Sequence, residues 1–367
     1  MARRASQSVL PEQADDFAPR LLRWFDVNGR HDLPWQHPRT PYRVWLSEIM
    51  LQQTQVKTVI PYFERFVTAL PTLPALAAAA RDEVMALWSG LGYYARARNL
   101  QAAAQRCMEL HGGDLPRDID ALTALPGIGR STAAAILSQA WGDRYAILDG
   151  NVKRVLTRFH GIDGYPGAPV VEKQLWGLAE HHVSSQHLPD ARMADYTQAQ
   201  MDLGATLCTR SDPACVLCPL QDDCVARRDG RITELPTSKP GKAVPQKHAC
   251  VLWLENARGE ILLQRRPSTG IWAALWTLPQ ADDAVSLRDW FERQSHDGLA
   301  GAEALPAIDH AFSHYKLRLQ PLRLRGIASH DIALAKRVGD NDDLRWVDLG
   351  ELATLGIPAP IRKLLEA

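Results

Sequence analysis

Residues 208–224, CTRSDPACVLCPLQDDC, place four cysteines at the spacing C-x6-C-x2-C-x5-C, directly behind a long run with helical periodicity. Four thiols so close together indicate a shared ligand. Disulfides are the weaker explanation, because no apolar secretory segment is present and cysteine clusters of intracellular proteins more often bind metal. Zinc ribbons usually present two C-x2-C pairs, whereas an iron-sulfur cluster tolerates unequal arms. The spacing therefore favours a cluster and leaves zinc open, with Cys208, Cys215, Cys218 and Cys224 as the ligands.

The composition is that of a soluble globular protein. The 367 residues are too many for one ordinary core and predict two or three domains. Apolar residues make up 46% and charged residues 23%. No stretch approaches the length of a membrane span, so we expect no membrane partner. The 42 basic and 42 acidic residues cancel, so any binding of nucleic acid must depend on local features.

Residues 17–228 have apolar positions at spacings of three and four, with Pro or Gly between segments, which predicts a helical domain. One helix should begin at Pro41, because proline suits a first helical position. Glu48 lies inside the apolar part of this helix, followed by Gln52 and Gln53. The ordinary explanation is a glutamate on the wet face of the helix. Its apolar flanks favour a concave polar site instead.

Residues 125–129, LPGIG, separate a predicted helix ending near Ala124 from an alanine-rich helix beginning near Arg130. Gly127 and Gly129 predict a tight hairpin that leaves backbone N–H groups free at a helix start, where a DNA phosphate can bind. A simple connection between helices is the alternative. The helices on both sides favour a helix-hairpin-helix motif.

Residues 148–151, LDGN, precede another amphipathic helix, so Asp149 or Asn151 should be its N-cap. Capping alone explains an aspartate at this position. The helix dipole would also keep the carboxyl group ionised. The basic residues that follow predict a basic face toward DNA, or else an ordinary solvated face: Lys153, Arg154 and Arg158.

A second domain follows a linker. Residues 229–247 are rich in Pro, Gly and basic residues, which is typical of a linker. Within 248–367 the apolar period becomes two: CVLWLEN and EILLQRR predict a hairpin, YKLRLQPLRLR a strand with a bulge or edge at Pro321, and RWVDL a short strand. SLRDWFER and PAPIRKLLEA predict helices. We therefore expect a helical domain at 1–228, which includes the cysteine loop, and a smaller α+β domain at 248–367.

Several motifs in this order resemble the helix-hairpin-helix DNA glycosylases with an iron-sulfur cluster, and closely the A/G-specific adenine glycosylase (MutY) family: PYRVWLSEIMLQQTQV, GLGYYARARNL, LPGIGRSTA, LDGNVKRVL and the cysteine loop. The resemblance covers nearly the whole chain. It implies a multidomain fold, with an all-α catalytic domain carrying a 4Fe-4S cluster and a C-terminal Nudix-like domain. It also implies a monomeric, cytoplasmic and nucleoid-associated repair enzyme that flips adenine out of A:8-oxoguanine or A:G mispairs in double-stranded DNA.

The resemblance also implies roles for single residues. Glu48 matches the general acid that protonates the adenine ring nitrogen, Asp149 the carboxylate that stabilises the oxocarbenium sugar, and Asn151 a residue that holds this site. Apolar surroundings would raise the pKa of Glu48 while the helix start keeps Asp149 charged, as cleavage by acid and counter-charge requires. The implied DNA contacts are Gln53 near the opposite base, Tyr93 as an aromatic wedge, Gly127 and Gly129 in the hairpin, Ser131 and Lys153.

Ser131 separates two reaction types within the superfamily. The endonuclease III branch has a lysine there, which attacks the sugar and then cleaves the strand. Without that amine no Schiff base can form at this position, so we predict a monofunctional glycosylase that leaves the abasic strand intact. Some adenine glycosylases have tyrosine here, so serine can change contacts without changing the reaction class.

The C-terminal domain predicts recognition rather than catalysis. GIWAALWTLPQ resembles the approach to the catalytic box of Nudix hydrolases, but ADDAVSLRDWFERQ lacks the glycine and the glutamates that would bind magnesium. Phe312, Ser313 and His314 match the family's loop that inspects 8-oxoguanine opposite the target adenine. An ordinary strand start is the alternative for these three residues.

Three other functions remain open at this point. A bifunctional or thymine-directed glycosylase of the same superfamily is opposed by Ser131 and by the second domain. A hydrolase of oxidised nucleotides is opposed by the missing Nudix box. A non-catalytic DNA-binding protein with a structural metal would leave Glu48 and Asp149 unexplained.

Overall fold

The computed structural model describes residues 16–241, 244–294, 299, 301–312, 315–327 and 344–366. The described residues form two compact units. The first is drawn from Met1–Val67, Thr72–Pro74 and Ala103–Pro240, and the second from Thr68–Pro71, Ala75–Ala102 and Gly241–Ala367. The second unit therefore includes a helical segment from the region before the linker. The division at 1–228, 229–247 and 248–367 stays a prediction.

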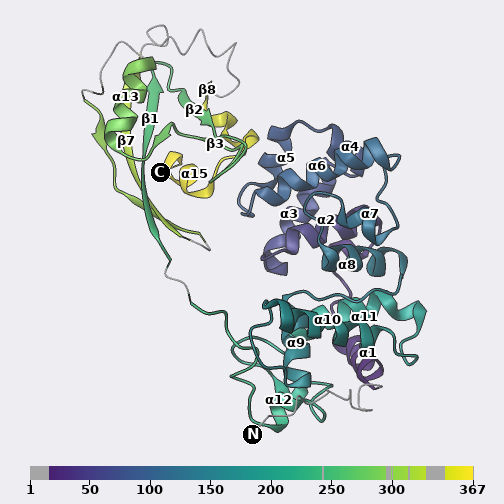
Figure 1. The fold of residues 1–367 in the computed structure, drawn as a ribbon. Coiled ribbons are helices and arrows are strands. Elements are labelled where there is room, and N and C mark those ends of the chain that lie inside the picture. Colours follow the sequence, from purple (N-terminus) through teal and green to yellow (C-terminus); the bar gives the residue numbers. More distant parts are fainter. Residues whose placement is uncertain are drawn as a thin grey trace. The chain divides into compact units, whose positions relative to one another are not determined.

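The helical prediction for residues 17–228 is confirmed, because the described residues 16–241 contain helices and no strand (Figure 1). The α-helices are α1 (Phe17–Asn28), α2 (Pro41–Leu51), α3 (Val56–Ala69), α4 (Leu73–Ala78), α5 (Arg81–Trp88), α6 (Ala95–Leu110), α7 (Ile119–Thr123), α8 (Arg130–Trp141), α9 (Gly150–His160), α10 (Pro169–Val183), α11 (Met193–Thr206) and α12 (Val225–Arg228). Short 3-10 turns lie at η2 (Pro34–Gln36), η3 (Asp190–Arg192) and η4 (Cys215–Leu217).

Helix ends in the first unit follow the local sequence. α2 begins at Pro41 as predicted, and the Thr40 hydroxyl accepts a hydrogen bond from the backbone N–H of Arg43 at 3.3 Å. α9 is capped at its start by Asp149 and ends at Gly161, whose φ of 66° is the left-handed conformation that glycine adopts without strain. The two predicted catalytic carboxyl groups therefore belong to well-defined helix positions.

One hydrophobic core holds α1, α8, α9, α10 and α11 together. It is built from side chains at helical spacing, because each helix presents one apolar face inward. Its fully buried members include Phe17, Leu21, Leu156, Leu175, Tyr196, Ala199 and Leu203. This core fixes the helix that carries Asp149 against α11.

The C-terminal part of the second unit is a mixed sheet, which confirms the predicted α+β domain (Figure 1). Its strands are β1 (Gln246–Asn256), β2 (Ile261–Arg265), β3 (Trp276–Thr277), β4 (Gln280–Ala281), β5 (Glu303–Ala304), β6 (Ile308–Ala311), β7 (Lys316–Ile327) and β8 (Leu344–Val347). The order is β3-β2-β1-β7-β5; β4 pairs with β1, β6 with β7 and β8 with β2. β1 and β2 form the predicted hairpin, while β1 and β7 are parallel.

Pro321 does not lie on an edge strand, but the pairing on one side of β7 shifts by one residue there, between Ala304–Leu322 and Ile308–Leu319, so the bulge alternative is confirmed. It sits opposite Val251 in the long β1–β7 pairing, and β5 and β6 pair with other parts of the same strand. The Pro321 carbonyl accepts a hydrogen bond from Leu305, between those two short strands. The nitrogen of Pro321, which has no hydrogen to donate, faces the β5 and β6 side of β7, as its carbonyl does. The hydrogen bonding between strands is interrupted there, so proline costs little pairing.

Helices α13 (Ala284–Gln294) and α15 (Ala359–Leu365) confirm the two helices predicted in this domain, and a 3-10 helix, η5, spans Leu349–Thr354. The buried residues that pack α13 on the sheet include Leu252, Leu254, Leu262, Leu287 and Phe291. α13 occupies the place of the expected Nudix box, but its only carboxylates are Asp289 and Glu292. The fold of the sheet is therefore kept without the glutamate cluster that would bind magnesium.

Candidate active site

Glu48 lies on α2 between Ser47 and Ile49, which are 1% and 2% exposed, and is itself only partly accessible to solvent. Gln139, on the buried face of α8, donates a hydrogen bond from Nε2 to Glu48 Oε1 at 2.9 Å. Burial and then the charge of Asp149 raise the pKa of Glu48 to about 7, although the Gln139 hydrogen bond lowers it. The carboxyl group can therefore hold a proton near neutral pH and still meet a substrate.

Asp149 is the N-cap of α9, as one of the two predicted alternatives had it. Its Oδ1 accepts a hydrogen bond from the Val152 N–H at 2.8 Å, and its Oδ2 accepts one from Asn151 Nδ2 at 3.4 Å. Burial raises the pKa of Asp149, while the Val152 N–H, Arg154 and Asn151 lower it. The helix start alone therefore does not keep this carboxyl group ionised, and the neighbouring donors are needed to favour the charged form.

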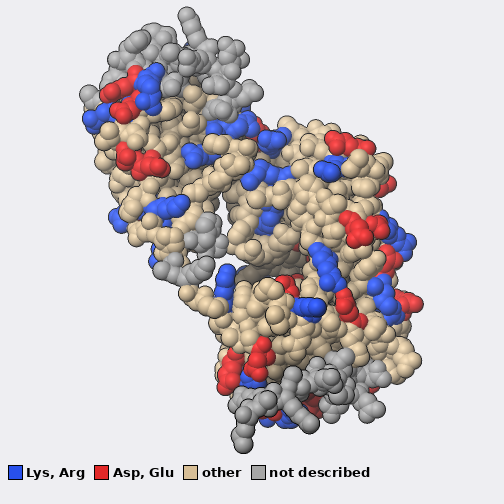
Figure 2. Space-filling model, viewed as in Figure 1, with Lys and Arg blue, Asp and Glu red and all other residues tan. Residues whose placement is uncertain are grey.

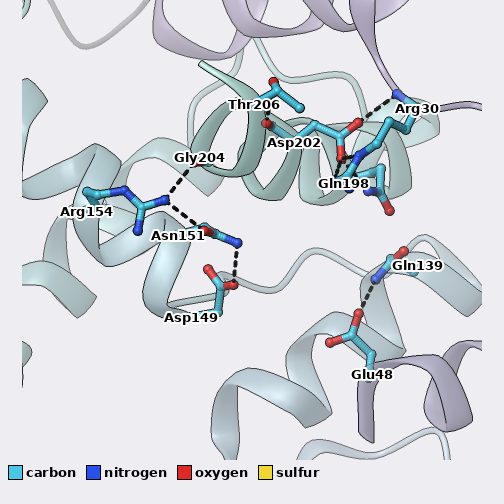
Figure 3. A network of polar contacts seen from close by, with 10 residues as sticks. All are labelled: Arg30, Glu48, Gln139, Asp149, Asn151, Arg154, Gln198, Asp202, Gly204 and Thr206. Atoms are coloured by element: carbon cyan, nitrogen blue, oxygen red, sulfur yellow. Dashed lines mark hydrogen bonds and ion pairs between the residues drawn. The ribbon is translucent and has the colours of Figure 1, made fainter. Parts of the chain in front are cut away.

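Arg154 joins Asn151 to Gly204 of α11, as Figure 3 shows, and also contacts the cysteine loop. Its Nη2 donates to Asn151 Oδ1 at 2.9 Å and to the Gly204 carbonyl at 2.6 Å, and its Nε donates to the Cys208 carbonyl at 2.7 Å. A Cβ at Gly204 would lie 2.5 Å from Asn151 Cβ, so only glycine lets α11 approach α9 this closely. Asn151 is thus held by the Arg154 hydrogen bond and by the close packing of Gly204, and its amide nitrogen donates to Asp149.

Glu48 and Asp149 face each other across one open space, on helices far apart in the sequence (Figure 3). Their carboxyl groups interact electrostatically, because the charge of Asp149 raises the pKa of Glu48. The arrangement sets Glu48, whose pKa is raised, opposite Asp149, which is held by hydrogen bonds from Val152 and Asn151 and lies near the Arg154 guanidinium. It can donate a proton on one side and stabilise positive charge on the other.

The predicted hairpin at residues 125–129 is present. Gly127 has a φ of 78°, and Gly129 is the N-cap of α8, which has no side-chain cap. Backbone N–H groups at the first turn of α8 can therefore bind an anion. The Ser131 hydroxyl accepts a hydrogen bond from the Leu148 N–H at 3.0 Å, so it supports the backbone next to Asp149. Contacts of Gly127, Gly129 and Ser131 with DNA stay predictions.

The four cysteines of residues 208–224 line one small cavity of about 30 Å³, together with Arg158 and Arg227. The structure describes all six cysteines of the chain, and none is disulfide-bonded. Within the described residues, no group of His, Cys, Asp and Glu is placed to hold a single metal ion. Burial raises the pKa of Cys218 to about 12, so its thiolate needs a positively charged ligand. Four cysteine side chains around one shared space are a donor set that fits a thiolate-bound iron-sulfur group.

The prediction of a basic face on α9 was wrong for two of its three residues. Arg158 is 2% exposed and donates to the Thr209 carbonyl at 2.6 Å and to Cys208 Sγ at 3.4 Å, while Arg154 makes the contacts given above. Both face the cysteine loop because they lie four residues apart on one side of the helix. Lys153 is partly buried and pairs with Glu172 at 2.6 Å, and its contact with DNA stays a prediction.

Two of the predicted DNA contacts have unusual backbones. Gln53 and Tyr93 have φ values of 60° and 50°, in the left-handed region that non-glycine residues rarely adopt. Gln53 is exposed, and Tyr93 is 47% exposed despite its aromatic ring. Such conformations persist where the surroundings impose them, often at binding sites. The two roles stay predictions, with this strain as physical support.

Phe312 follows β6 in the second unit and lies in an aromatic cluster. Its ring stacks on Tyr315 with centroids 4.5 Å apart, meets His310 edge-on at 4.6 Å and lies 5.8 Å from Trp272. The next two predicted recognition residues, Ser313 and His314, lie outside the described residues. The role of this segment stays a prediction.

Charged side chains of both signs lie near one another on the visible face (Figure 2), in keeping with the zero net charge. Contacts with DNA must therefore come from particular side chains and helix starts. Among the helices that the structure describes, none is long and apolar enough to cross a membrane.

Comparison with known proteins decides the family. Residues 46–181 match the model of the HhH-GPD superfamily base excision DNA repair proteins, and residues 250–367 match that of the NUDIX domain. The adenine DNA glycosylase of Buchnera aphidicola from Acyrthosiphon pisum is 35% identical over 95% of this chain and 97% of that protein. The chain belongs to the adenine DNA glycosylases. The human adenine DNA glycosylase is also 35% identical, over 95% of this chain and 73% of its own.

Membership of the adenine DNA glycosylases makes the protein an enzyme that hydrolyses N-glycosyl bonds in DNA repair, as the sequence motifs implied. This finding excludes the alternatives of a nucleotide hydrolase and of a non-catalytic DNA-binding protein. The helical part also resembles a solved thermostable thymine-DNA glycosylase, with 28% identity, a TM-score of 0.53 and coverage of 59% of this chain and 97% of that one. The helical fold is thus shared across glycosylases that differ in the base they remove.

Two residues that shape the adenine glycosylase site, Gln139 and Gly204, were not predicted from the sequence, and a third, Arg154, was predicted on the wrong side of its helix. Gln139 is a polar residue inside the apolar helix α8, and that contrast was a signal for a buried partner. Arg154 lies one turn after Asn151, but its inward direction follows only from the position of α11. Gly204 gave no signal of its own, because a glycine inside a helix has many explanations.

Proposed function

We propose that this adenine DNA glycosylase removes adenine paired with 8-oxoguanine or guanine and leaves the DNA strand intact. The observation that carries the proposal is the pair of carboxyl groups across one open space. Burial and the charge of Asp149 raise the pKa of Glu48 to about 7, while Val152, Asn151 and Arg154 favour the ionised form of Asp149.

In the proposed reaction, Glu48 gives its proton to a ring nitrogen of the flipped adenine, so the base leaves as a neutral molecule when the bond to the sugar breaks. The sugar becomes an oxocarbenium ion, which the Asp149 carboxylate stabilises directly or through a covalent bond. Water then adds to the sugar carbon and loses a proton, which returns Glu48 to its protonated form. Asn151 holds Asp149 in place through its amide group.

The hairpin and the exposed strained residues supply the rest of the proposal. Flipping a base costs a few kcal/mol, which contacts with phosphate and with the opposite strand offset. Gly127 and Gly129 at the start of α8 suit a phosphate, Tyr93 suits a wedge between bases, and Gln53 suits a contact near the opposite base. Ser131 and Lys153 are further proposed contacts on this DNA face.

We also propose that Cys208, Cys215, Cys218 and Cys224 hold a 4Fe-4S cluster. The cavity that they share, and the finding that none of them is disulfide-bonded, support a thiolate-bound iron group over disulfides. Arg154 and Arg158 would then tie the cluster loop to α9. In this position the cluster would stabilise the fold around Asp149, and no step of base release requires it.

Matched duplexes test the proposed reaction in single-turnover assays. We expect adenine release opposite 8-oxoguanine and guanine, and none from A:T or T:G, with strand breaks only after alkali. Borohydride should trap no covalent DNA adduct, because Ser131 provides no amine for a Schiff base. Breaks without alkali together with a strong adduct would show a lyase. Release of thymine from T:G would show a thymine-directed glycosylase instead.

The loop at residues 312–314 is proposed to recognise 8-oxoguanine. Replacing Ser313→Ala together with His314→Ala should reduce the preference for 8-oxoguanine over guanine by about tenfold, because one or two hydrogen bonds to the oxidised base are lost. The rate on the better substrate at saturating enzyme should change less. Single-turnover rates and Kd values on both duplexes measure this, and equal losses on the two would contradict the assignment.

A further inference from the structure

Residues 89–94, SGLGYY, connect α5 to α6 in the second unit, and we call them the wedge turn. Gly90 and Gly92 have φ values of 97° and 77°, and Tyr93 follows at 50°. Glycine adopts this backbone without strain, whereas tyrosine does not. Contacts around the turn must therefore hold Tyr93 in this conformation, with half of its side chain exposed.

The first set of contacts comes from the two helices themselves. Trp88 Nε1 donates to the Gly92 carbonyl at 3.1 Å, and Arg96 Nη2 donates to the same carbonyl at 3.1 Å. The Arg96 guanidinium also lies 5.3 Å from the centres of the Trp88 and Tyr93 rings. Arg96 is 7% exposed, and burial lowers its pKa to about 10. These contacts hold the inner side of the wedge turn.

The second set comes from the C-terminal domain. The Ile357 carbonyl accepts hydrogen bonds from Ser89 Oγ at 3.0 Å and from the Tyr94 hydroxyl at 3.5 Å. The oxygen of Tyr94 in turn accepts the Gly90 N–H at 3.3 Å. One buried carbonyl near the end of the chain thus connects to both ends of the wedge turn.

Gly356 brings that carbonyl close to α5. A Cβ at this position would lie 2.6 Å from Met85 Cβ, 3.2 Å from the Met85 carbonyl carbon and 3.0 Å from Leu275 Cδ2. Its backbone is not in the left-handed region, so α5 and the Leu275 side chain are what exclude a larger residue. The Gly356 carbonyl accepts the Trp276 N–H at 2.9 Å, which fixes it to β3.

An ion pair fixes the other end of α5 to the same sheet. Arg265 on β2 donates two hydrogen bonds to the Asp82 carboxylate, both at 3.0 Å, and Trp276 Nε1 donates a third at 3.4 Å. Farther along, Arg98 on α6 donates to the Ala273 carbonyl at 2.8 Å. The helices on both sides of the wedge turn are therefore bound to the C-terminal sheet.

We infer that the C-terminal domain positions Tyr93 for the opening of DNA, through the contact of Gly356 and Ile357 with the wedge turn. The domain then has a second task besides inspection of the opposite base. The inference rests on the proposed role of Tyr93 as a wedge. It makes Gly356 a positioning residue, which acts on the reaction only through Tyr93.

Gly356→Ala tests the inference, with Gly241→Ala as its matched control, since a Cβ at Gly241 meets nothing within 4 Å. Single-turnover adenine release from an A:G duplex at saturating enzyme should slow by about tenfold in Gly356→Ala and stay unchanged in Gly241→Ala. In a Tyr93→Ala background, Gly356→Ala should change the rate by less than about twofold, because two residues that act as a unit are not additive. Iron content and thermal unfolding check that each variant is folded.

Equal slowing by Gly356→Ala with and without Tyr93 would overturn the inference, since a general loss of stability does not depend on Tyr93. A Tyr93→Ala protein as fast as the parent would overturn it too, and the adenine release of the parent would still support the proposed function. A parent without activity on either mispair would refute the proposed function itself. If Gly356→Ala does not fold, Ser89→Ala replaces it in the same cycle, with an expected slowing of about threefold.

Discussion

Glu48→Gln is expected to slow adenine release by at least about a hundredfold, which is the lower part of the range for losing a general acid. The amide keeps the size of the side chain and an oxygen for the Gln139 Nε2 donor, so the packing of α2 should not change. It has no proton with a pKa near neutrality to give to the base. Binding of A:G and A:8-oxoguanine duplexes should stay within about threefold of the parent, because binding does not require the proton.

The pH dependence supplies an independent check on Glu48. A general acid works in its protonated form, and the pKa of Glu48 is about 7. The rate constant of base release should therefore be full below this pH and fall as the pH rises through about 7, and the fall should disappear in Glu48→Gln. Glu234→Gln, an exposed glutamate in the same unit, serves as the control and should match the parent. Parental turnover in Glu48→Gln would remove Glu48 from the acid role.

The sequence was sufficient for those parts of the site that depend on neighbours along the chain. Pro41 and Asp149 mark helix starts through their own backbone chemistry, and residues 125–129 form a hairpin because two glycines lie between helices. The spacing of the four cysteines predicted that they lie together, and they line one cavity. Each of these predictions needed only a few consecutive residues.

The rest of the site depends on how distant helices pack. Arg154 and Arg158 looked like a solvent-facing basic surface, yet both donate to carbonyls of the cysteine loop. Nothing local shows this, because the acceptors lie some fifty residues away. The burial of Asp149 likewise opposes the ionisation that its helix start favours, and burial is a property of the packed core.

The contact between the wedge turn and the C-terminal domain joins residues far apart in the chain, since Ser89 and Ile357 are separated by 268 residues. A glycine at position 356, in a loop before a proline, has many local explanations. Its packing against Met85 becomes visible only when the sheet and α5 lie in one compact unit. Sequence reasoning could predict a recognition role for the domain but not the proposed positioning of Tyr93.

Asp149→Asn should reduce adenine release by about a hundredfold or more, the loss typical of removing one fixed electrostatic contact from a transition state. Asparagine is as good an N-cap as aspartate, and its oxygen can still accept the Val152 N–H. The change therefore removes the negative charge and leaves the helix start in place. The measurement is the single-turnover rate at saturating enzyme on A:8-oxoguanine and A:G duplexes, with both substrates expected to lose equally.

Asp118→Asn is the matched control, because Asp118 caps α7 in the same way, with its Oδ1 accepting the Ala121 N–H at 2.8 Å. If losing an aspartate cap were enough to disturb the helical domain, the two variants would unfold at similarly lowered temperatures and both would lose activity. If the charge acts on the sugar, both variants should unfold at the temperature of the parent protein. Only Asp149→Asn should then lose activity. Because the same change should also lower the pKa of Glu48 by removing a nearby negative charge, the pH at which the residual rate falls should move down. A residual rate with an unchanged pH profile would mean that the two carboxyl groups do not share the site.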